Sequence, residues 1–148
     1  EPYEKIRGGF FRGLALAFGE DNMNNTLPLA YRWLRANGVS KLLPWHFIEP
    51  QEGDGAVNAF RKEYDGEKRD LVCIARRQDC DDFAGFEILK SNVTDRVIYF
   101  HPAFNYQPNE GIISGEYDDL WAFIREVVIP DTIDWCSEED LEDLRRIK

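Results

Sequence analysis

Residues 70–102 read DLVCIARRQDCDDFAGFEILKSNVTDRVIYFHP, and the rest of the chain is organised around them. The stretch holds three apolar runs rich in β-branched and aromatic residues: Asp70–Ala75, Phe83–Leu89 and Arg96–His101. The polar loops between them, 76–82 and 90–95, are too short for the crossover helix that parallel neighbours need. The stretch therefore predicts an antiparallel meander. Its last run is apolar on both faces, so it is either covered on both sides or presents one face as an interface.

A helix is predicted upstream of the meander. From Leu27 to Leu34 the apolar residues follow the i, i+3, i+4, i+7 spacing of one helix face. Thr26 is a suitable N-cap, Pro28 is tolerated in a first turn, and Asn37-Gly38 provides a left-handed exit.

The same spacing predicts further helices over residues 10–18, 57–64 and 117–128, and after Ser137. Between Pro44 and Pro50 we expect a short edge strand, followed by a loop over residues 51–55. We also expect a long loop over residues 102–115, with Ser114 capping the helix that follows and Pro130 ending it. Strands segregated from helices indicate an α+β fold: one domain over residues 1–148, an antiparallel sheet with the meander at its centre, and N-terminal and C-terminal helices packed against it.

Composition limits the classes of partner. The chain has 148 residues, 14% of them aromatic, and a formal net charge of −10. This charge disfavours direct binding to nucleic acid or to an anionic membrane, whereas it permits a basic protein partner. No apolar run approaches the about 18 residues of a membrane-spanning helix. Three cysteines cannot all pair within one chain, so we expect a reducing, cytoplasmic compartment.

The residues that could carry chemistry form no recognised pattern. There is no phosphate loop, dinucleotide fingerprint, nucleophile elbow or His-Glu-x-x-His sequence. Cys80 is a candidate nucleophile with His101 as its base, but the neighbouring acids disfavour the thiolate form of Cys80. Cys73 is expected to be a buried core residue. Zinc and calcium sites lack their usual ligand spacing. We therefore predict no catalytic residue, cofactor or metal and favour a binding protein over an enzyme of unfamiliar type.

Four stretches, taken in order, resemble the SUKH superfamily, and within it the family related to fungal cell-wall-assembly regulators. They are Leu27-Pro28-x-x-Tyr31-x-x-Leu34-x-x-Asn37-Gly38, then 71–75 with the aromatic strand 83–89, then 96–101, and finally Tyr117-x-x-Leu120-x-x-Phe123-Ile124. The resemblance covers about residues 27–129. It leaves the segment 10–18 and the last helix without counterparts.

In bacteria this family is associated with toxin–immunity systems. The resemblance implies a non-catalytic cytoplasmic immunity protein that binds and neutralises a cognate toxin, often a nuclease. A basic nuclease and an acidic inhibitor attract each other, which agrees with the charge. The alternative that the resemblance allows is a regulatory scaffold that binds signalling or cell-wall-assembly proteins.

Candidate contact residues follow from this partner. Acids in predicted loops with no evident internal partner are expected to face it: Asp79, Asp81, Asp82, Glu110 and Glu116. Trp45 and Tyr106 are candidate aromatic anchors. For Trp121 we favour core packing.

Overall fold

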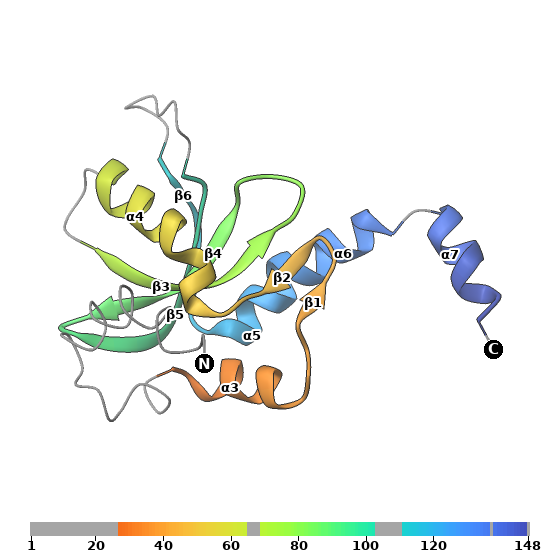
Figure 1. Ribbon diagram of the computed structural model, residues 1–148, viewed down its shortest axis with the longest axis horizontal. Coiled ribbons are helices and arrows are strands. Elements are labelled where there is room, and N and C mark those ends of the chain that lie inside the picture. The colour runs from red at the N-terminus through yellow and green to blue at the C-terminus, as the bar shows by residue number, and fades with distance from the viewer. Residues whose placement is uncertain (1–26, 65–68, 103–110, 137, 148) are drawn as a thin grey trace, which may run out of the picture.

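The computed structural model describes residues 27–64, 69–102, 111–136 and 138–147. Its centre is a six-stranded antiparallel sheet in the order β1-β2-β3-β4-β5-β6, so each strand pairs with its neighbours in sequence. The strands are β1 Lys41–Leu42, β2 Trp45–Phe47, β3 Asp70–Arg77, β4 Phe83–Leu89, β5 Asn92–Phe100 and β6 Ile113–Tyr117. The predicted meander, β3-β4-β5, is confirmed at the middle of this sheet (Figure 1).

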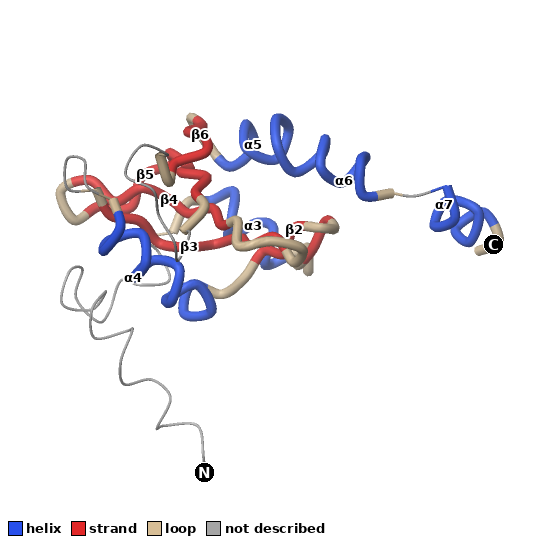
Figure 2. Tube along the Cα trace, turned by 90° about the horizontal axis from the view of Figure 1, so that it is seen from above, coloured by secondary structure: helices blue, strands red, loops and turns tan. Residues whose placement is uncertain are grey.

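Helices pack on both faces of the sheet, which confirms the α+β prediction. The described helices are α3 Leu29–Ala36, α4 Asp54–Glu63, α5 Leu120–Phe123, α6 Ile129–Trp135 and α7 Glu138–Arg145, with a 3₁₀ helix η2 at Pro50–Gly53 and a π-helical turn η3 at Ile124–Val128. The last of them, α7, was predicted to pack against the sheet but lies away from it (Figure 1). Figure 2 shows α5 and α6 on one side of the sheet and α4 on the other. Among the described residues no helix is long and apolar enough to cross a membrane.

Strand β5 explains why two layers of helix are needed. Val97 and Tyr99 join the core under α3 and α5, whereas Ile98 and Phe100 join the core under α4. Neighbouring residues on a strand point to opposite faces, so an unbroken apolar run supplies both cores at once. Of the two alternatives that the sequence left open for this strand, the structure has the one in which both faces are covered.

Trp45 organises the core on the α3 and α5 face. Its side chain is 0% exposed, and its ring lies edge-on to Tyr99 and to Phe123, with centroid distances of 5.5 and 5.2 Å. Its Nε1–H donates to Oδ2 of Asp131 on α6 at 2.7 Å. This tryptophan thus joins β2 to the sheet centre and to the C-terminal helices.

Helix α3 is fixed to the sheet by its predicted face. Tyr31 and Leu34 are buried, and the Tyr31 hydroxyl donates to the carbonyl of Ile48 at 2.8 Å. The predicted exit is confirmed, since Gly38 has φ +72°. Pro28, however, is the N-cap rather than a first-turn residue.

Strand β6 contradicts the predicted loop over residues 102–115. Ser114 lies inside this strand and caps no helix; instead the Asp119 carboxylate accepts from the backbone N–H of Ala122 at 2.8 Å and caps α5. The sequence hid the strand because Ser114 and Gly115 are weak strand formers. Pairing with β5 supplies the stabilisation that local propensity lacks.

The sequence predicted that Pro130 ends the helix, and this prediction is wrong. The chain continues as α6 to Trp135, with Pro130 in its first turn. Just before it, the N–H of Ile129 donates to the carbonyl of Ile124, five residues back. This π turn breaks the α register, so the proline follows a break in the helix rather than interrupting a regular one.

Three smaller boundaries also differ from the sequence predictions. Trp45–Phe47 lies between β1 and β3 rather than at the sheet edge, and Pro44 falls in the turn before it, where its missing N–H removes no ladder bond. The expected loop 51–55 is η2 and the start of α4. Strand β5 begins at Asn92, because Lys90 and Ser91 adopt positive φ and make a tight turn. The predicted helix over 10–18 and the caps Thr26 and Ser137 lie outside the described residues.

Candidate functional site

The predicted acidic turn joins β3 to β4, and two of its three aspartates have internal partners. Both carboxylate oxygens of Asp79 accept from Arg77 at 2.9 Å, and this guanidinium lowers the pKa of Asp79. Asp82 accepts from the Tyr99 hydroxyl at 2.6 Å and lies 2.6 Å from Nδ1 of His101. Only Asp81 is exposed with no hydrogen bond or ion pair to another described residue.

Glu116 was predicted to be an unpartnered loop acid, and that prediction is wrong. It lies in β6 and forms ion pairs with Arg69 and, at 3.4 Å, with Arg96. The hydrogen bond from Arg69 is the main cause that lowers the pKa of Glu116. Arg69 also pairs at 2.9 Å with Glu87, which is buried. This cluster ties the three strands after β3 together, so its charges are already neutralised.

The structure describes only one of the two predicted aromatic anchors, and that one is buried. Trp45 is enclosed in the core, and it is therefore unavailable as a surface anchor. The sequence prediction failed because the prolines around it suggested an edge strand. Trp121, for which core packing was favoured, is 44% exposed. Glu110 and Tyr106 lie outside the described residues.

The candidate nucleophile is poorly placed for catalysis. Although Cys80 is exposed, partial desolvation of its thiol and the carboxylates of Asp82 and Asp79 raise its pKa to about 11, so it is protonated at neutral pH. Burial raises the pKa of Cys73 to about 12. Within the described ranges no three His, Cys, Asp or Glu side chains are grouped so that they could hold a metal ion.

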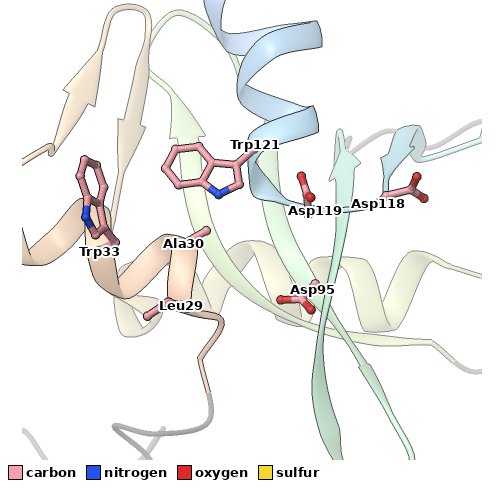
Figure 3. Close-up of a pocket in the computed structure, with 7 residues that line it drawn as sticks. All are labelled: Leu29, Ala30, Trp33, Asp95, Asp118, Asp119 and Trp121. Atoms are coloured by element: carbon pink, nitrogen blue, oxygen red, sulfur yellow. The ribbon is translucent and has the colours of Figure 1, made fainter.

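A groove lies between α3 and α5. It has a volume of about 510 Å³ and is lined by Leu29, Ala30, Trp33, Asp95, Asp118, Asp119 and Trp121; we call it the tryptophan groove. The rings of Trp33 and Trp121 meet edge to face, with centroids 6.1 Å apart. Figure 3 shows the Trp121 indole above Ala30 and the Trp33 indole to the left, with the three carboxylates on the right.

The helix faces explain why these tryptophans are exposed. Because Tyr31 and Leu34 turn one side of α3 into the core, Leu29 and Trp33, four residues apart, share another side. Trp33 is 52% exposed. On α5 the buried residues are Leu120 and Phe123, which leaves Trp121 beside them at the surface.

The acids of the groove come from three places in the chain. Asp95 lies on β5, two residues before Val97, and so shares the sheet face that α3 and α5 cover. Asp118 and Asp119 link β6 to α5, where one oxygen of Asp119 caps the helix. Asp95 and Asp118 are exposed and make no hydrogen bond or ion pair within the part of the chain that the structure describes.

The groove and the acidic turn are separate surfaces. Asp82 contacts His101, just past the end of β5, whereas Asp95 lies near the start of this strand. The five residue steps along the strand from Asp95 to Phe100 correspond to about 17 Å. Trp33 was not among the predicted contact residues, although the sequence holds one signal for it: it is a large aromatic residue outside the apolar stripe of a well-marked helix.

No family model, no curated protein and no solved structure matches this chain.

Proposed function

We propose that this protein is a non-catalytic protein-binding domain that acts as an immunity protein: it binds a cognate toxin, of nuclease type, and neutralises it by covering its active surface. The observation that carries the proposal is the tryptophan groove, in which Trp33 and Trp121 are exposed beside three carboxylates. The four stretches that resemble the SUKH superfamily support the choice of an immunity role.

Exposed tryptophans support protein binding because they are costly to leave in water. Tryptophan is enriched among the residues that dominate the binding energy of protein interfaces. Leu29 extends the apolar surface beside Trp33, and both are more than half exposed. A contiguous apolar patch with a polar rim is typical of an interaction site.

Charge supports a basic partner. The chain carries a net charge of −10, and none of the residues that line the groove is basic. A nuclease needs a basic surface to hold nucleic acid. An acidic inhibitor would therefore associate faster with it and would be oriented by the same field.

A cytoplasmic location is part of the proposal. Cys73, Cys80 and Cys136 are all free, and the last two are exposed. Free exposed thiols are typical of a reducing compartment.

The test is growth rescue. The C-terminal domain of the protein encoded beside this gene is expressed in a test host, alone, with this chain, or with an unrelated acidic protein. We expect toxicity that only this chain relieves. The double variant Trp33→Ala/Trp121→Ala should lose the rescue while its circular dichroism stays unchanged. Trp135→Ala is the matched control, since Trp135 is an exposed tryptophan on α6, outside the groove. Toxicity that this chain does not relieve contradicts the proposal.

A regulatory scaffold is the second candidate, and one observation favours it. Beyond α6, helix α7 lies away from the sheet (Figure 1) and exposes Leu141 and Leu144 on one side. A second apolar surface, separate from the groove, suits a protein that joins two partners. A pull-down that recovers signalling or cell-wall-assembly proteins, together with failed rescue, would favour this function.

A further inference from the structure

The geometry points to an arginine side chain, presented by a basic segment of the protein partner, as the occupant of the tryptophan groove. This inference rests on the proposed function, because it names the chemistry by which the toxin is recognised. In this arrangement the guanidinium group of the arginine lies against an indole face of Trp33 or Trp121. The positive charge of the guanidinium is then next to the carboxylates of Asp95 and Asp118.

The apolar half of the groove suits the stem of a long side chain. Leu29, Ala30 and the two indoles provide a wall without charge, and Figure 3 shows them on one side of the carboxylates. Arginine lays its methylene stem on such a surface while its head group reaches a polar site. A short or fully apolar side chain would leave Asp95 and Asp118 without a partner from the occupant.

The acidic half favours a cation. Asp95, Asp118 and Asp119 all line the groove, and no lysine or arginine of this chain lines it with them. Asp119 already uses one oxygen on the N–H of Ala122. Asp95 and Asp118 have no such partner within the described ranges, so they are available to an incoming charge.

Guanidinium fits this combination better than ammonium does. A planar guanidinium is weakly hydrated, stacks on an aromatic face and offers five N–H donors to carboxylates, whereas lysine is a compact, strongly hydrated point charge. Cations within about 6 Å of an indole centroid are attracted by the ring quadrupole, most strongly by tryptophan. The Trp33–Trp121 pair places two such rings 6.1 Å apart beside the acids.

The test uses the full chain and three peptides that differ at one residue: acetyl-Gly-Arg-Gly-amide, its lysine analogue and its citrulline analogue. Citrulline keeps the shape of arginine without the charge. The chain has four tryptophans, so its NMR spectrum carries four indole N–H signals, which Trp→Phe variants assign. We expect the arginine peptide to shift the signals of Trp33 and Trp121 and to leave buried Trp45 and distant Trp135 unchanged.

Three further results are expected. The citrulline peptide gives no saturable shift of the Trp33 and Trp121 signals, and the lysine peptide binds more weakly than the arginine peptide. In 0.5 M salt the affinity for the arginine peptide falls. Asp118→Asn weakens arginine binding about two- to fivefold, as expected for one exposed ion pair. Asp81→Asn, which removes an exposed acid of the separate turn, is the matched control and changes nothing.

Several outcomes would overturn the inference: no shift of the two groove signals, equal shifts with citrulline, equal affinity for lysine, or no effect of Asp118→Asn. Its failure is distinguishable from failure of the proposed function. Growth rescue without binding of the arginine peptide would contradict this inference but not the proposed function. Binding of the arginine peptide without growth rescue would contradict the immunity function but not the inference that the groove binds arginine.

Discussion

Replacing Trp45 by phenylalanine should destabilise the fold more than any exposed tryptophan change. Trp45 is completely buried and is the point where β2, the sheet centre and α6 meet. Phenylalanine keeps a ring in the core, but it removes the indole N–H that donates to Asp131. It also leaves part of the space between Tyr99 and Phe123 unfilled.

The magnitude follows from these two losses. A hydrogen bond to a charged acceptor contributes about 1.5–3 kcal/mol, and the cavity from this volume change costs about 1 kcal/mol more. Asp131 keeps its contact with Arg77 at 3.2 Å, which limits the penalty of the freed carboxylate. We therefore expect the free energy of unfolding to fall by about 2–4 kcal/mol.

Urea denaturation followed by far-UV circular dichroism measures the change, with Trp135→Phe as the matched control. Trp135 is 38% exposed on α6, so its replacement should alter the free energy of unfolding by less than about 0.5 kcal/mol. In a double-mutant cycle, Trp45→Phe and Asp131→Ala should be non-additive, because each of them removes the same hydrogen bond. A loss below about 1 kcal/mol for Trp45→Phe, or full additivity, would refute this account of the core.

Three further outcomes are expected. Gly85→Ala should lower the free energy of unfolding by about 1–3 kcal/mol, because the new Cβ would lie 2.5 Å from a carbonyl oxygen of β3; Gly55→Ala, with open space around it, should not, and thermal melts separate the two. The rate at which iodoacetamide labels Cys80 should keep rising with pH up to about pH 11; a rate by peptide mass spectrometry that levels off near the ordinary thiol pKa of about 8.5 would contradict the raised pKa of Cys80. The pKa of Glu116 is lowered in the folded state, so its stabilisation is complete above about pH 4.5 and is lost as the pH falls through the folded-state pKa. Glu116→Gln should thus be less stable than the natural chain at pH 7, and urea melts should show the gap closing towards pH 3.

The meander could be predicted because its signals are local. Runs of β-branched and aromatic residues separated by short polar loops restrict the chain to antiparallel neighbours. The helix around Tyr31 was predictable for the same reason, since its apolar face and its Gly38 exit lie within a few residues of each other.

The sequence-based predictions failed where long-range contacts override the local preference of the chain. Strand β6 contains serine and glycine, and only pairing with β5 makes it a strand. A proline normally ends a helix, but Pro130 follows a π turn that shifts the register of the helical hydrogen bonds, and the helix continues. Glu116 looked unpartnered because Arg69, which neutralises it, lies far away in the sequence.

By itself the sequence determined the fold class, the central meander, the first described helix and the acidic net charge. These depend on residue types, on spacing within short windows and on total charge, none of which needs coordinates. Only the tertiary structure decided which side chains meet. It buried Trp45, paired two aspartates of the acidic turn, and brought Trp33 and Asp95 to Trp121. The groove exists because packing α3 and α5 on one face of the sheet brings Trp33 and Trp121 together, and no local pattern encodes this contact between distant segments.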